Sequence, residues 1–219
     1  MSDLTLSEQA YADLRTMIVR LELAPGDVLR EDDLRARLGI GRTPIREALQ
    51  RLAREHFVTV IPRRGMFVAG IDVSELSMLF ETRTVLEPYA ARLAAARGTD
   101  EHWTRMDAEL KATTKARGDN ERLMAIDRRC HELMWQAAGN RFLLDTLDTL
   151  YAQSDRLWHL YLAEVADMSH AVSEHRTILD ALRSGDGDRV ADLVEAHVRS
   201  FDGDIRAAVT ERLESPLAG

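Results

Sequence analysis

The sequence has a single cysteine, Cys130, so no disulfide can form within the chain. It also has no uninterrupted apolar run near the roughly 18 residues that a membrane-spanning helix needs. The first residues, MSDLTLSEQA, do not place an apolar segment after a basic one, as a secretory signal would. These absences predict a cytoplasmic protein that crosses no membrane.

Positive charge is in the minority overall but is concentrated in one segment. The chain has 29 Lys and Arg against 37 Asp and Glu, a net charge of −8, which argues against a nucleic-acid partner only if the charge is evenly spread. Residues 1–70 carry +1 and residues 71–219 carry −9, and between Arg42 and Arg64 there are six Arg against two Glu. A basic surface beside an acidic remainder would orient the molecule on DNA.

The length of the chain leaves room for two domains, each with its own core. Up to about residue 70 the pattern mixes helices and strands, and beyond it helical periodicity dominates. We therefore predict one domain over residues 1–70 and a second over residues 71–219.

Two short helices joined by a tight turn are predicted in the first domain. The first would run from about Arg30 to Leu38 and end at Gly39. The second would begin with Thr43 as its N-cap and Pro44 at the first helical position. This arrangement is typical of a helix-turn-helix, whose second helix enters the major groove of DNA.

The start of the second helix carries Arg42 and Arg46 one turn apart, away from its apolar face. The planar fork of arginine matches the O6 and N7 acceptors of guanine, so these two side chains are candidates for reading bases. Each of them taken alone could also be an ordinary solvated charge.

A hairpin should follow, with strands over Phe57–Ile61 and Met66–Ala69. Its tip carries Arg63, Arg64 and Gly65, which suit contact with a phosphate or insertion into a minor groove. The helix pair and the hairpin together predict a winged helix.

The residues LGIGRTPIREALQRL, followed by a hairpin tipped with PRRG, resemble the N-terminal domain of the GntR family of bacterial transcription regulators. The family usually has a small hydroxyl residue where this chain has Gly41, so one hydrogen bond to phosphate is missing here. The DNA contacts that the resemblance implies are Arg35, Arg42, Thr43, Arg46, Arg64 and Gly65.

The second domain should be an antiparallel bundle of about six to seven helices, because helical segments recur between short breaks. Pro88 should kink or split the first of these helices. The fold class is thus mainly α. The breaks lie at Gly98, Gly118, Gly139-Asn140, Asp167 and Gly185-Asp186-Gly187.

Four ionisable side chains interrupt the apolar faces of this bundle, and burying them without partners would be costly. His175 and His197 each lie ten positions from the glycine turn at 185–187, so a helical hairpin brings both to about 15 Å above that turn. Asp127 and His131, four residues apart on a third helix, complete a set that borderline divalent metals accept.

The segments DRRCHELMWQAAGN, SEHRTILDAL and EAHVRSF resemble the three metal-binding segments of the FCD domain, the ligand-sensing part of the FadR-type subgroup. The resemblance implies a divalent metal (Zn, Ni or Mn) and a small organic acid as effector. Cys130 stands where that family commonly has an aromatic residue, and we interpret it as a buried apolar side chain rather than a fifth ligand or a redox switch. The metal ligands that the resemblance implies are Asp127, His131, His175 and His197.

Arg83 lies within the apolar face of the first bundle helix, where a guanidinium needs an acidic partner. Two partners remain open. One is Glu87, a single turn away; the other is the carboxylate of an effector held between Arg83 and the metal.

These patterns predict a homodimeric transcription regulator, not an enzyme, that binds operator DNA under the control of a small carboxylate at the metal. The family resemblance implies repression as the commoner mode. One alternative is a metal-dependent hydrolase, but the sequence has no H-E-x-x-H motif and no evident general base beside the four ligands. Another is a purely structural bundle whose histidines bind nothing.

Overall fold

The computed structural model describes residues 4–161 and 168–214. These residues form two compact units, one made of residues 4–72 and 155–160 and the other of residues 73–154, 161 and 168–214. Residues 155–160 are the last turns of a helix whose earlier residues belong to the second unit, which is not apparent from the sequence.

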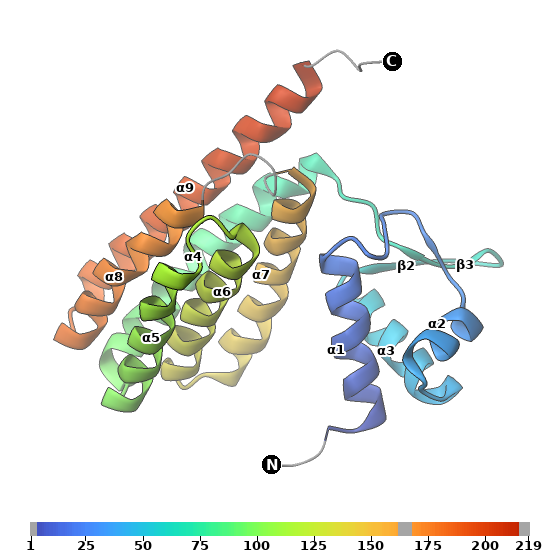
Figure 1. The fold of residues 1–219 in the computed structure, drawn as a ribbon, viewed down its shortest axis with the longest axis horizontal. Coiled ribbons are helices and arrows are strands. Elements are labelled where there is room, and N and C mark those ends of the chain that lie inside the picture. The colour runs from blue at the N-terminus through green and yellow to red at the C-terminus, as the bar shows by residue number, and fades with distance from the viewer. Residues whose placement is uncertain (1–3, 162–167, 215–219) are drawn as a thin grey trace. The chain divides into compact units, whose positions relative to one another are not determined.

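The first unit contains three helices and a small antiparallel sheet (Figure 1), as the sequence predicts for a winged helix. The strand β1 has only two residues and so carries no alternating pattern that would reveal it. The sheet order is β1-β3-β2, and Val60 pairs with Met66 in the hairpin. The elements are α1 (Leu6–Val19), β1 (Val28–Leu29), α2 (Glu31–Leu38), α3 (Arg42–Arg54), β2 (Val58–Ile61) and β3 (Gly65–Val68).

Aliphatic faces of α1 and α3 form the core of this unit. Leu14 and Ile18 of α1 are fully buried, as are Ile45 and Leu49 of α3. Burial of side chains of this size stabilises the fold by about 1.5–3 kcal/mol each. The apolar face of α3 is therefore packed into the core, and the first turn of α3 lies at the surface.

Gly39 ends α2 in a left-handed conformation with φ 67°, as predicted. The start of α3 differs from the prediction, because Gly41 is the N-cap and Arg42 is the first helical residue. Thr43 is therefore not the N-cap. Pro44 is tolerated deeper in the first turn because the first four N–H groups of a helix have no intrahelical acceptor.

The described residues of the second unit form helices joined by short turns, with no strand (Figure 1), which confirms the predicted bundle. The glycine breaks at 98, 118, 139 and 185–187 fall between helices, whereas the break predicted at Asp167 lies outside the described residues. The elements are α4 (Val73–Arg97), α5 (Asp100–Ala112), the 3₁₀ segment η1 (Thr113–Lys115), α6 (Asn120–Ala137), α7 (Arg141–Tyr161), α8 (Met168–Ser184) and α9 (Gly187–Glu214).

Helix α4 runs unbroken through Pro88, so the prediction that the proline splits it is wrong. A proline inside a helix removes one backbone hydrogen bond and crowds the preceding turn. Packing offsets this cost, since α4 lies against α9, α6 and α8, and Ala90, Ala91 and Ala94 are fully buried. Helices α6 and α8 also pack against each other and against α5.

None of the described helices is long and apolar enough to cross a membrane.

Candidate metal centre and nucleic-acid interface

Asp127, His131, His175 and His197 come together inside the second unit. One potential ligand atom from each of them lies within 4.8 Å of the other three. Two of these residues come from α6, one from α8 and one from α9, and their exposed fractions are only 1–4%. The structure therefore joins the four residues that the sequence singled out.

The distances within this cluster are those of groups that share a common centre. The Nε2 atoms of His131 and His197 are 3.2 Å apart. Oδ2 of Asp127 lies 3.7 Å from Nε2 of His131, and Oδ1 lies 3.6 Å from Nε2 of His197 and 3.5 Å from Nδ1 of His175. The carboxylate thus reaches all three imidazoles.

A divalent cation fits this donor set. Oδ1 of Asp127 and Nε2 of His175 are buried and have no hydrogen-bond partner among the described residues. Leaving such an atom unpaired costs about 1–3 kcal/mol, and coordination of a cation would remove that cost. Three imidazoles with one carboxylate suit zinc and other borderline divalent metals.

The protonation states of two of the four residues, Asp127 and His175, suit a metal. Burial raises the pKa of Asp127, but the imidazoles of His175, His131 and His197 more than offset this and hold it below its usual range. Burial lowers the pKa of His175 to about 3, against the opposing effect of Asp127. At neutral pH Asp127 is therefore an anion and His175 is neutral, as metal coordination requires.

Three further side chains contact the cluster, and the sequence analysis assigned none of them to it. The hydroxyl of Tyr151 donates to Oδ2 of Asp127 at 2.7 Å. Oε2 of Glu87 lies 2.8 Å from Nδ1 of His131, and Oε2 of Glu174 lies 2.6 Å from Nδ1 of His197. These contacts join different helices, and helical spacing within one segment does not reveal them.

Arg83 has an internal partner. Its Nε donates to Oε1 of Glu87 at 2.6 Å, and both side chains are buried. Burial raises the pKa of Glu87, but the guanidinium of Arg83 and the neighbouring imidazole of His131 outweigh it and hold the pKa at about 2. Of the two partners proposed for Arg83, the structure contains the i,i+4 partner, and the effector contact stays a prediction.

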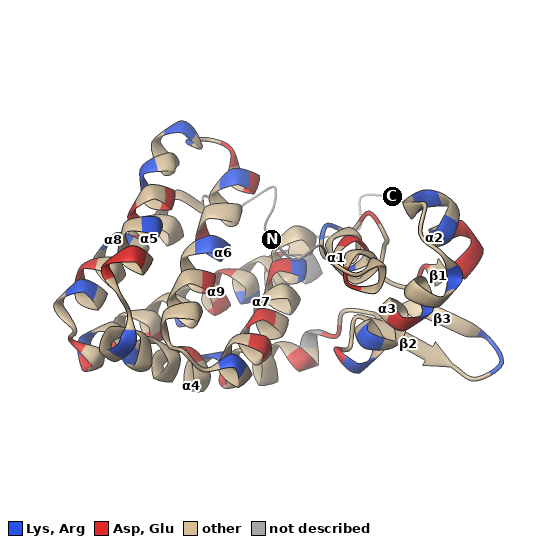
Figure 2. Ribbon diagram, turned by 90° about the horizontal axis from the view of Figure 1, so that it is seen from below, with Lys and Arg blue, Asp and Glu red and all other residues tan. Residues whose placement is uncertain are grey.

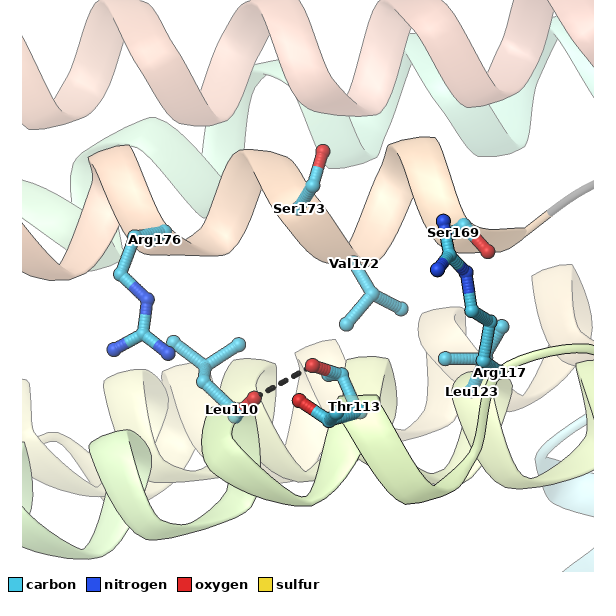
Figure 3. Close-up of a pocket in the computed structure, with 9 residues that line it drawn as sticks. Leu110, Thr113, Arg117, Leu123, Ser169, Val172, Ser173 and Arg176 are labelled. Atoms are coloured by element: carbon cyan, nitrogen blue, oxygen red, sulfur yellow. Dashed lines mark hydrogen bonds between the residues drawn. The ribbon is translucent and has the colours of Figure 1, made fainter.

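A cavity of about 340 Å³ lies between α5, η1 and α8 (Figure 3). Arg117 and Arg176 lie at opposite ends of it, with Leu110 and Val172 between them in this view. None of the four cluster residues lines this cavity, nor does Arg83. It is close to the cluster along the chain, since Leu123 precedes Asp127 on α6 by one helical turn.

Cys130 is fully buried on α6, and burial raises the pKa of its thiol. We expect a thiol reagent to modify the native protein at least about 100-fold more slowly than the unfolded chain, because the thiolate is the reactive form. We also expect Cys130→Ala to retain its metal content. Rapid labelling of the native protein, or loss of metal from this variant, would favour a ligand or redox role.

The candidate nucleic-acid interface lies on α2 and the start of α3. Arg42 donates to Asp32 at 2.8 Å, and Arg46 makes two hydrogen bonds to Glu31 at 2.9 and 3.0 Å. The hydrogen bond from Arg46 holds the pKa of Glu31 below its usual range. Both predicted base-reading arginines are exposed and already have carboxylate partners on α2.

The other predicted DNA contacts lie near these arginines in the chain or on the wing. Arg35 on α2 donates to Asp32 at 2.9 Å, and Thr43 is the second residue of α3. Arg64 lies in the turn between β2 and β3, which is basic (Figure 2), and Gly65 opens β3 with φ 108°. This positive φ suits glycine, because other residues are strained there.

Comparison with known families matches two separate segments of the chain. Residues 6–68 match the bacterial regulatory proteins of the gntR family, and residues 78–200 match the FCD domain.

The relatives of this chain are transcription regulators. It is 31% identical over 204 residues to an uncharacterized HTH-type transcriptional regulator of Streptomyces ambofaciens, covering 89% of this chain and 83% of the relative. It is 28% identical over 203 residues to the HTH-type transcriptional repressor RspR of Escherichia coli (strain K12), covering 92% and 89%. It is 30% identical over 200 residues to the Nta operon transcriptional regulator of Aminobacter aminovorans, covering 89% and 94%.

Solved structures share the fold. E. coli McbR/YncC superposes with a TM-score of 0.83 at 21% identity, covering 94% of this chain and 99% of that one. A putative transcriptional regulator GntR from Rhodococcus sp. RHA1 superposes with a TM-score of 0.72 at 19% identity, covering 92% and 98%. At these identities the likeness is one of fold.

Proposed function

The chain belongs to the GntR family of bacterial regulatory proteins and carries an FCD domain, and from this premise we propose that it is a repressor controlled by a small organic acid. Like its relatives, the chain is a DNA-binding transcription regulator and not an enzyme. The hydrolase alternative therefore does not hold. We also propose which residues contact DNA and the metal, where the effector binds, and that the protein is a homodimer.

Residues 1–70 are the proposed DNA-binding domain. Two copies in a homodimer would place two winged helices on the half-sites of a pseudo-palindromic operator. The first turn of α3 would enter the major groove, where Arg42 and Arg46 would contact base edges. We assign contacts at the surrounding backbone to Arg35, Thr43, Arg64 and Gly65.

Residues 71–219 are the proposed effector-binding and dimerisation domain. Asp127, His131, His175 and His197 would hold one divalent cation, and a bound cation supplies open coordination positions to a carboxylate. Convergence of these four buried groups is the single observation that supports this part of the proposal. The effector must bind the DNA-bound and DNA-free arrangements of the dimer with different affinity, because otherwise it would regulate nothing.

The experiment that tests the sensing function is a thermal-shift screen of small carboxylates, run with and without a chelator. We expect at least one acid to raise the melting temperature of the metal-loaded protein by several degrees, because it binds only the folded state. The chelator should abolish that shift. Protein purified without a histidine tag excludes metal bound by the tag.

A structural bundle whose histidines bind nothing predicts a different result. It would retain less than about a tenth of an equivalent of metal and gain no thermal stability from added Zn²⁺, Ni²⁺ or Mn²⁺. A screen in which every stabilising acid is indifferent to the chelator would place the effector away from the cluster.

A further inference from the structure

Two of the clustered imidazoles have a carboxylate beside the ring nitrogen that is not directed at the other imidazole. Glu87 of α4 lies 2.8 Å from Nδ1 of His131, and Glu174 of α8 lies 2.6 Å from Nδ1 of His197. In both pairs the contact uses Nδ1, while the two Nε2 atoms face each other at 3.2 Å. A carboxylate thus lies beside Nδ1 in both pairs. The contact of His197 with Glu174 is a hydrogen bond, whereas the contact of His131 with Glu87 is a short ion-pair contact.

The chemistry of imidazole gives this arrangement a consequence. A neutral imidazole carries its proton on one nitrogen and a lone pair on the other. An anion beside Nδ1 favours the proton at that atom, which leaves the lone pair on Nε2 for a metal. A carboxylate here therefore selects the tautomer and also fixes the direction of the ring.

We propose that Glu87 and Glu174 are positioning residues that orient His131 and His197 toward a common divalent cation. This inference rests on the metal centre proposed above and adds two residues that do not touch the metal. Helix α4 supplies no ligand to the cluster, so its part in the centre is to position His131 through Glu87.

The third imidazole is held differently. Nδ1 of His175 lies 3.3 Å from the backbone carbonyl oxygen of Ala171, one turn earlier on its own helix. The hydrogen bond at Nδ1 of His175 therefore comes from its own helix, whereas the carboxylates beside His131 and His197 come from neighbouring helices. Loss of either glutamate would free one ligand while His175 stays in place.

The two glutamates differ in how safely they can be replaced. Glu87 is 0% exposed and also holds Arg83, which is 2% exposed, so removing its charge leaves a buried guanidinium without an anion. The side chain of Glu174 is 30% exposed and can be neutralised without burying an unpaired charge. Glu174 is therefore the position to test first.

The test is cobalt binding by the full-length chain carrying Glu174→Gln or Glu174→Ala. We expect the Co²⁺ dissociation constant, measured by competition with a chelator, to rise about 10- to 100-fold. The visible absorption of bound Co²⁺ should change, because the geometry around the ion changes. The melting temperature of the metal-free protein should stay within a few degrees of that of the unchanged chain.

The matched control is Glu195→Gln on α9, an exposed glutamate that pairs with Arg199 and lies two residues from His197. It should leave both the affinity and the spectrum unchanged. For the second glutamate, the pair Arg83→Leu with Glu87→Gln removes both buried charges together and should weaken Co²⁺ binding to a similar extent.

Unchanged affinity and spectrum in both Glu174 variants would overturn the inference, while metal binding by the unchanged chain would still support the proposed centre. Failure of the unchanged chain itself to bind Co²⁺, Zn²⁺, Ni²⁺ or Mn²⁺ would overturn the metal centre and the inference together. Whether the unchanged chain binds a metal therefore distinguishes the two failures.

Discussion

Replacing both Arg42 and Arg46 with alanine is expected to weaken operator binding about 100-fold or more. Each bidentate contact between an arginine and guanine contributes about 1–3 kcal/mol of discrimination, and the two residues occupy the first turn of the recognition helix. The effect should be larger on the operator than on unrelated duplexes, because base contacts and not only phosphate contacts are lost.

The measurement is a titration of labelled duplex with purified protein, at one fixed salt concentration, using a sequence selected from random duplexes by the unchanged chain. The control is the double variant Arg51→Ala with Arg54→Ala, which removes the same two positive charges from the other end of α3, where both side chains are exposed. Equal losses in this control and in the variant of Arg42 and Arg46 would show that charge alone, and not base reading, accounts for binding.

Replacing Asp127 with asparagine is expected to lower the metal affinity of the second unit more than about 100-fold. Asp127 is the only anion among the four ligands, and its oxygens approach all three imidazoles. Loss of a metal ligand should lower the metal affinity more than loss of a residue that only hydrogen-bonds to a ligand, which typically lowers it about 10- to 100-fold. The amide keeps the size of the side chain and can still accept the hydrogen bond from Tyr151.

Metal content after exhaustive dialysis and the melting-temperature gain on adding Zn²⁺ measure this effect. Asp180→Asn, an exposed change on α8, is the control and should retain both properties. Full metal content in the Asp127 variant would mean that the ion binds elsewhere, and the four-residue centre would then be rejected.

Much of the candidate site follows from local patterns in the sequence. His175 and His197 lie at equal distances from a glycine turn, so a helical hairpin must place them at the same height. Asp127 and His131 lie one turn apart on one helix, which brings both to the same face. These relations depend only on helical geometry and on one tight turn, and spacing therefore predicts them.

Other parts depend on which helices become neighbours. Glu174 reaches across from α8 to α9, and Glu87 reaches from α4 to α6, so neither contact is encoded in spacing along one helix. The start of α3 also differed from the prediction, because an extended glycine, Gly41, can precede a helix as well as a hydroxyl residue can. Packing decides such details, and periodicity does not determine packing.

If Arg42 and Arg46 read bases as proposed, the acidic start of α2 has a consequence for how the protein distinguishes its operator from random DNA. Arg42 and Arg46 are already engaged with Asp32 and Glu31 before any duplex arrives. On a random stretch of DNA, these arginines would exchange a carboxylate partner for a phosphate. This exchange of one anion for another gains little binding free energy. A matching guanine edge adds two directed acceptors, so the exchange of partners favours release from random sequence and retention at the correct one.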